Sequence, residues 1–197
     1  MIIWRRLKAP SQIIMLNSIK LQFFIIAFWV LLFIFNGAIN KVLYHNSYIA
    51  IIFIPAGFKI TIACLLGKRV FWGLFVGSLI TALLFLEEAM IKHALMFALL
   101  SAGSPILTIW LVNYLMPLGK KLQNLNFQKI LIISVVYSII NSFMHNTYLL
   151  MSEGLTLEKY QADSLLMLTG DFFGSLIFLF LLSYYRRGIL RIIHKYI

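Results

Sequence analysis

The sequence predicts an all-α integral membrane protein, a bundle of about six transmembrane helices with both termini in the cytoplasm. Of the 197 residues, 62% are hydrophobic and 12% are charged, whereas a soluble domain is about half apolar and a quarter charged. The apolar residues gather in long runs, and most runs approach the roughly 20 residues with which a helix crosses a bilayer. The alternating short segments of a membrane β-barrel are missing from the sequence.

Six apolar runs follow one another along the chain. They occupy residues 21–39, 48–66, 70–86, 93–117, 130–151 and 166–185. Because these runs use most of the chain, we predict one polytopic membrane domain over residues 1–197, with no room for a soluble catalytic domain. No small-residue cleavage site follows the first run, which favours an uncleaved helix over a signal peptide. Residues 186–197 are expected to form a basic cytoplasmic tail that lies on the inner leaflet as a short amphipathic helix.

The distribution of charge predicts the orientation of these helices. The N-terminus, the second and fourth connections and the C-terminus hold thirteen of the 17 Lys and Arg residues and no acidic residue. Short basic segments stay on the cytoplasmic side of a membrane, so both termini are predicted there. We expect a multi-pass protein of a bacterial cytoplasmic (inner) membrane. Topology and contact with anionic membrane lipids then explain the basic charge, and no nucleic-acid partner is expected.

Polar and helix-disturbing residues converge on the outer half and the midplane of the predicted bundle. At about 1.5 Å per residue, they lie roughly 8 to 18 Å below the outer surface. Such residues are tolerated at this depth where they face protein or a wet cavity, so we predict a polar pocket that opens outward. Pro and Gly are also common as kinks and packing residues in membrane helices, and this alternative stays open. The residues are Pro55, Gly57, Lys59, Gly103, Pro105, Asn141, His145 and Asp171.

Lys59 and Asp171 are the only formal charges well inside the predicted helices. An isolated charge at the bilayer centre is unfavourable by several kcal/mol, about 3 on insertion scales. We therefore predict an ion pair between the two helices that carry them. Such a pair either fixes helix packing, or binds a ligand or senses protons. Asn141 and His145 share one helical face and are expected to line the pocket or to bond to neighbouring helices.

The second run contains an unusual combination of Pro55, Gly57 and Lys59. Proline lacks an N–H and crowds the preceding turn, so we predict that Pro55 bends this helix in its outer half. Gly57 removes bulk beside the bend and allows a neighbour, such as the Gly170–Gly174 face, to come close. Lys59 then projects into the space that the bend opens. The glycine of Gly67-Lys68-Arg69 suits a helix end, and its two cations suit the inner leaflet.

Two further patterns predict tight packing, and no pattern predicts catalysis. Gly73-x-x-x-Gly77 and Gly170-x-x-x-Gly174 have the spacing at which glycines let helix backbones approach closely. The sequence holds no nucleophile elbow, phosphate loop or HExxH motif, so we expect no enzyme activity and no cofactor. His93, with Glu87 and Glu88, lacks a second histidine, and we expect no metal site.

The residues from Pro55 to Ser78 resemble the first class of membrane-associated sensor (MASE) domains. The pattern consists of Pro55-x-Gly57, Leu65-Leu66-Gly67-x-Arg69, Trp72-Gly73 and Gly77-Ser78. The pair Gly170-Asp171 with Gly174 is similar to the family's second hallmark. The resemblance implies a helical sensory module of the kind that precedes a cytoplasmic cyclase, phosphodiesterase or kinase. The six runs depart from the family's usual eight or so, and Lys59 replaces an expected small apolar residue.

Three functions fit these observations. The first is a sensory or ligand-binding membrane module that acts through a separate protein partner, because no output domain follows Ile197. The second is a substrate-binding subunit similar to the S-components of energy-coupling-factor transporters, although the first run lacks their small-residue docking face. The third is a structural or assembly subunit of a larger membrane complex, for which faces rich in the 17 Phe residues would serve.

Overall fold

Helices form all the regular structure in the ranges that the computed structural model describes, residues 11–40, 52–85, 88–116 and 126–196. Five helical runs in these ranges have the length and composition to cross a membrane: Ser18–Asn40, Pro55–Phe85, Ala94–Leu115, Phe127–Glu153 and Leu157–Leu182. The predicted all-α membrane class is therefore confirmed, with five runs of sufficient length instead of six. The elements are α1 (Ser11–Asn40), α2 (Pro55–Leu66), the 3₁₀ turn η1 (Gly67–Val70), α3 (Phe71–Phe85), α4 (Glu88–Ile91), α5 (Ala94–Leu115), α6 (Phe127–Glu153) and α7 (Leu157–Tyr196).

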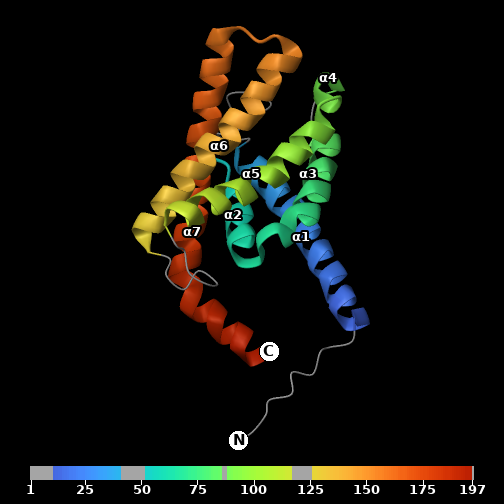
Figure 1. Ribbon diagram of the computed structural model, residues 1–197, viewed down its shortest axis with the longest axis vertical. Helices are drawn as coiled ribbons and strands as arrows, with labels where there is room; N and C mark the ends of the chain where they lie inside the picture. Colours follow the sequence, from blue (N-terminus) through green and yellow to red (C-terminus); the bar gives the residue numbers. More distant parts are fainter. Residues whose placement is uncertain (1–10, 41–51, 86–87, 117–125, 197) are drawn as a thin grey trace, which may run out of the picture.

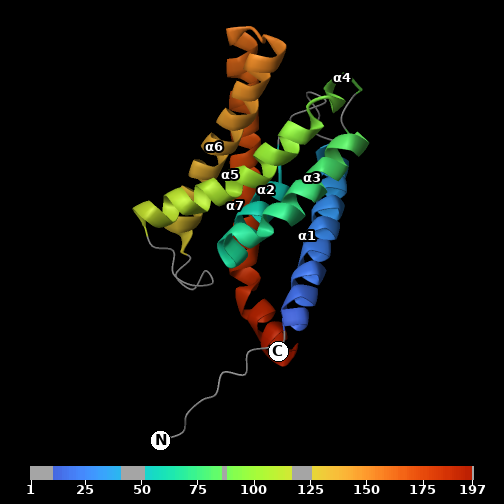
Figure 2. The same ribbon diagram turned by 45° about the vertical axis from the view of Figure 1, so that its right-hand side comes forward.

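The ends of the helices fall into two groups (Figures 1 and 2). The start of α1 and the end of α7 lie toward the lower end of both views, with the η1 turn above them, while α4 and the α6–α7 connection lie toward the upper end. α5 crosses the bundle obliquely between these groups. The start of α1 and the end of α7 therefore lie toward the same end of the bundle.

The predicted full-length helix over residues 48–66 is wrong for the part that the structure describes. Residues 52–54 are not helical, and α2 has 12 residues beginning at Pro55. Twelve residues reach about 18 Å, which is less than the roughly 30 Å of hydrocarbon in a bilayer. The predicted bend at Pro55 is also wrong, because Pro55 occupies the first turn of α2. There a missing N–H loses no helical hydrogen bond. Residues 48–51 lie outside the described ranges.

The η1 turn reverses the chain between α2 and α3, which therefore form a helical hairpin (Figure 1). Gly67 ends α2 with φ 58°, a backbone conformation that favours glycine, and its N–H donates to the carbonyl of Ala63. The side-chain amide of Gln22 on α1 donates to the carbonyl of Arg69 at 2.8 Å and ties the turn to α1. The prediction that Gly67 ends the second helix is confirmed.

The short helix α2 lies at the centre of the bundle. Each of its first nine residues, from Pro55 to Ala63, is buried. One apolar cluster joins α2 to α1, α3 and α5 through Trp29, Phe58 and Leu74, and a second joins it to α6 and α7 through Ile60 and Leu179. The longer helices around α2 carry the exposed Phe, Leu and Ile side chains that suit contact with lipid.

The remaining helices differ from prediction mainly in length. α5 is continuous through Pro105, so this proline does not interrupt it. α6 begins after Asn126, whose side chain accepts a hydrogen bond from the Lys129 N–H, and it ends at Gly154 in the left-handed conformation. α7 extends over 40 residues. It includes all of the predicted basic tail up to Tyr196, so this tail continues the last membrane helix.

Candidate functional site

The non-helical residues 52–54 are held by side chains and backbone of other helices. The Asn36 side chain on α1 accepts a hydrogen bond from the Ile54 N–H at 2.9 Å. The Asn40 amide group donates to the Ile52 carbonyl at 3.0 Å. The Phe53 N–H donates to the carbonyl of Gly170 on α7 at 2.9 Å. Irregular backbone at membrane depth needs such partners, and α1 and α7 supply them here.

Gly174 of α7 makes room for this segment. A Cβ added to Gly174 would collide with the backbone carbonyl carbon and oxygen of Phe53. A Cβ added to Gly57 would instead meet the Phe178 side chain, one turn further along α7. Gly57 therefore brings α2 close to α7, as predicted, but its neighbour is Phe178 and not the Gly170–Gly174 face.

The other glycine pair lies between α3 and α1. A Cβ on Gly73 would come within 2.8 Å of Gln22 and Ile25, and a Cβ on Gly77 within 2.8 Å of the Trp29 ring. These two glycines therefore let α3 approach α1 closely. Gly103 differs, because an added Cβ there meets nothing within 4 Å.

Lys59 lies in the middle of the bundle with 2% of its surface exposed. Its ammonium group donates to the Ser101 hydroxyl at 2.5 Å, and the Ser78 hydroxyl donates to the same oxygen at 3.1 Å. The Lys59 nitrogen also lies 4.7 Å from the centre of the Trp29 ring and 5.6 Å from that of Phe53. A cation is attracted to an aromatic face at this range, so aromatic rings and hydroxyl groups stabilise the buried charge.

Asp171 is equally buried, and its partners are different. The Asn141 amide donates to the Asp171 carboxylate at 2.7 Å, and the Ser104 hydroxyl donates to the Asn141 side-chain oxygen at 2.6 Å. The predicted direct ion pair is not formed, since Lys59 and Asp171 make no contact within 4.0 Å and have separate neutral partners. Because the two charges have opposite signs, they still attract each other through the intervening protein.

We call Lys59, Ser101, Ser104, Asn141 and Asp171 the charged centre. Four different helices contribute to it: α2, α5, α6 and α7. The Tyr137 side chain on α6 is completely buried, and its hydroxyl lies close to Ser104 and Asp171. The centre thus combines two charges of opposite sign that do not touch with neutral polar side chains around them.

Further polar side chains continue from the charged centre toward the α4 end of the bundle. The His145 ring bonds to the Asn141 carbonyl at 3.0 Å and stacks on Phe97. Nearer the end, His93 bonds to the Tyr148 hydroxyl and to the Glu153 carboxylate, both at 2.8 Å. Lys92 forms an ion pair with the same carboxylate at 2.7 Å. In the described part of the chain, no three His, Cys, Asp or Glu residues are grouped as metal ligands.

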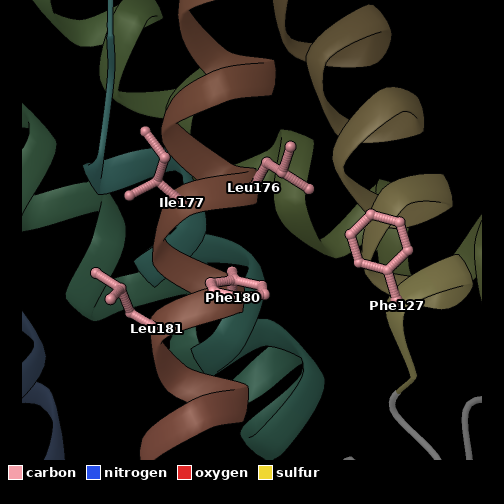
Figure 3. A pocket seen from close by; sticks show the side chains of 5 residues that line it. All are labelled: Phe127, Leu176, Ile177, Phe180 and Leu181. Atoms are coloured by element: carbon pink, nitrogen blue, oxygen red, sulfur yellow. The ribbon is translucent and has the colours of Figure 1, made fainter.

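The two cavities described here do not adjoin the charged centre. A cavity of about 240 Å³ is lined only by apolar side chains of α6 and α7, among them Phe127 and Leu176 (Figure 3). A larger cavity of about 760 Å³ lies between α5 and the hairpin of α2 and α3. Lys59 and Asp171 line neither of them.

Sequence reasoning missed several polar residues of this region. The sequence analysis did not identify Asn36 and Asn40. Two asparagines four positions apart lie on the same face of a helix, and at the end of an apolar run they indicate polar contacts with one neighbouring segment. Trp29 was also missed, because an aromatic residue in an apolar helix carries no sign of a nearby cation. Only the fold brings Trp29 to Lys59.

The comparisons with known proteins agree with this architecture. Searches of curated proteins and of solved structures found no match. The family model described as MASE1 matches residues 21–196, which is nearly the whole chain and includes every residue of the charged centre. The match supports the resemblance that the Pro55–Ser78 and Gly170–Gly174 patterns indicate. The chain therefore belongs to the MASE1 family and is a membrane-associated sensory domain.

Proposed function

We propose that this MASE1 domain senses a small polar solute or a proton that reaches the charged centre from the outer side of a bacterial inner membrane. The observation that carries the proposal is the separation of Lys59 from Asp171. Each buried charge has only neutral hydrogen-bond partners, so a ligand that bridges the two charges stabilises the centre, and a proton that neutralises Asp171 leaves the Lys59 charge uncompensated and shifts the balance between conformations. His145, His93 and Glu153 extend polar groups outward from the centre and support access from that side.

α7 provides a route by which the state of the centre is passed on. It contains Asp171 and continues without interruption to Tyr196, at the end of the bundle opposite α4 (Figure 1). A shift at Asp171 therefore displaces the far end of the same rigid helix. We propose that a partner protein at the cytoplasmic face reads this displacement, and that the domain itself catalyses no reaction.

The proposal is tested by measuring the position of α7 in the full chain. In a Cys64→Ser background, spin labels at Ile19→Cys and Leu181→Cys use exposed positions on α1 and α7. Neutralising the centre with Asp171→Asn should add a second population to the distance distribution measured by double electron–electron resonance. Asp163→Asn removes an acid near the start of α7 and is the matched control, which should leave the distribution unchanged.

Identical distributions for the native sequence and Asp171→Asn, in a protein that is still folded, contradict the proposal. The same shift in Asp163→Asn also contradicts it, because the effect would then not depend on the charged centre. The geometry of the described residues offers no observation that favours a transporter subunit or an assembly subunit over a sensor.

A further inference from the structure

The larger cavity is a groove beside the η1 turn, with a volume of about 760 Å³. Sites for small ligands commonly have about 300–1,000 Å³. Its walls come from α2, η1, α3 and the part of α5 from Gly103 to Asn113, and we call it the elbow groove. The side chains and glycines that line it are Ala63, Cys64, Gly67, Lys68, Phe71, Gly103, Ile106, Leu107, Ile109, Trp110 and Asn113.

The elbow groove combines apolar walls with one cation. Lys68 is the only residue with a formal charge among those that line it. The Lys68 side chain is exposed and has no hydrogen-bond or ion-pair partner within the described ranges. Arg69, which follows it, is also exposed. A ligand that complements this groove has an anionic group for Lys68 and an apolar part for the walls.

The surrounding aromatic residues indicate where the mouth of the groove lies in the membrane. Trp110 is 65% exposed and Tyr114 is 79% exposed on α5, and their rings stack at 6.3 Å. Trp72, just after the η1 turn, is also 65% exposed. Exposed Trp and Tyr gather where the membrane meets water. Lys68 thus lies at the level of lipid headgroups, whereas the open space at Gly103 lies farther toward the hydrocarbon.

We propose that the elbow groove binds one anionic phospholipid from the leaflet that adjoins the η1 turn. The lipid phosphate lies at Lys68, and one acyl chain runs along α5 past Ile106 toward Gly103. Basic pockets between transmembrane helices on the cytoplasmic side recognise lipid headgroups in this way. The exposed Leu107 and Trp110 leave the groove open sideways to lipid. This inference does not depend on the sensing role of the charged centre.

The test measures lipid binding to the full-length chain in detergent by native mass spectrometry, together with the melting temperature. Phosphatidylglycerol should bind and raise the melting temperature more than phosphatidylcholine with the same acyl chains. Lys68→Gln should weaken phosphatidylglycerol binding about fivefold, since one basic residue near a membrane surface contributes about 1 kcal/mol. Lys20→Gln removes an exposed cation from α1 and should leave binding unchanged.

A second pair of variants tests the position of the acyl chain. Gly103→Phe fills the groove and should abolish the response to phosphatidylglycerol. Gly37→Phe is the matched control, because an added Cβ at Gly37 likewise meets nothing within 4 Å and Gly37 does not line the groove. If Gly103→Phe does not fold, Lys68→Gln still tests the proposal, because Lys68 is exposed and its substitution should not disturb folding.

Three results would overturn the proposal. The first is equal stabilisation by phosphatidylglycerol and phosphatidylcholine. The second is an equal loss of binding in Lys68→Gln and Lys20→Gln, which would indicate attraction to the whole basic surface. The third is an equal rise in melting temperature with glycerol phosphate alone, which would indicate a site for a soluble anion.

Discussion

The environments of Lys59 and Asp171 differ in how they stabilise charge. Lys59 relies on one serine hydroxyl and on aromatic rings, whereas Asp171 relies on the Asn141 amide. None of these partners carries a formal charge. The opposite charge, across the residues between them, therefore also contributes to the stability of each buried charge.

This mutual dependence predicts strong coupling between the two positions. Lys59→Met or Asp171→Asn alone leaves one buried charge uncompensated and should lower the free energy of unfolding by roughly 2 kcal/mol. The double mutant should lose clearly less than the sum of the two. Thermal unfolding in detergent measures all three variants, with Lys20→Met as a control on the exposed surface. Additive losses would show that the two charges act independently.

Two glycines in membrane-spanning helices are predicted to respond oppositely to the same substitution. Gly174→Ala places a methyl group against the Phe53 backbone, which cannot rotate away, so we expect a loss of about 2 kcal/mol or more. Gly103→Ala meets open space, and we expect a change within about 1 kcal/mol, because alanine also favours the helix. Melting temperatures in one detergent compare the two. Equal destabilisation would contradict the close approach of Phe53 to α7.

Among the elements, residues 52–54 depend most on distant partners. The Ile54 N–H precedes the first turn of α2 and bonds to Asn36, whose side chain is buried. Loss of a partner for a buried polar group is unfavourable by about 1–3 kcal/mol. The start of α2, and with it the position of Lys59, is thus set partly by α1.

Replacement of Asn36 is therefore predicted to destabilise a helix other than its own. Asn36→Leu should lower the free energy of unfolding by about 1–3 kcal/mol and speed hydrogen exchange at residues 52–57. Ala38→Leu, at an exposed position two residues away, is the control and should change neither quantity. Faster exchange confined to α1 would contradict the role of Asn36 in holding α2.

At the scale of the whole molecule, the distribution of basic segments predicts the orientation in the membrane. The α6–α7 connection lies at the end opposite the start of α1 and the end of α7 (Figures 1 and 2). Gln161 is exposed in the first turns of α7, next to this connection. In a Cys64→Ser background, Gln161→Cys should react with an impermeant thiol reagent in intact spheroplasts, because the positive-inside rule places this end of α7 outside. A reporter fused after Ile197 should be cytoplasmic. Labelling of residue 161 only after lysis would reverse the orientation.

The sequence alone was sufficient for the class of protein and the family. Long apolar runs require helices in a bilayer, because backbone groups in hydrocarbon must bond within their own segment. The patterns around Pro55, Gly57 and Gly77, together with Gly170 and Gly174, indicated the MASE family without any coordinates. Gly67 could be recognised as a helix end because its role is local.

Only the tertiary structure decided how the second run is divided and which groups Lys59 and Asp171 bind. Residues 52–54 are apolar, and their sequence predicts a helix. They are not helical, because Asn36, Asn40 and Gly170 form hydrogen bonds with their backbone groups. Lys59 bonds to Ser101 and Asp171 bonds to Asn141, whereas the sequence predicted a direct ion pair between Lys59 and Asp171. These contacts join residues between 12 and 117 positions apart, and local sequence patterns carry no information about pairings over such separations.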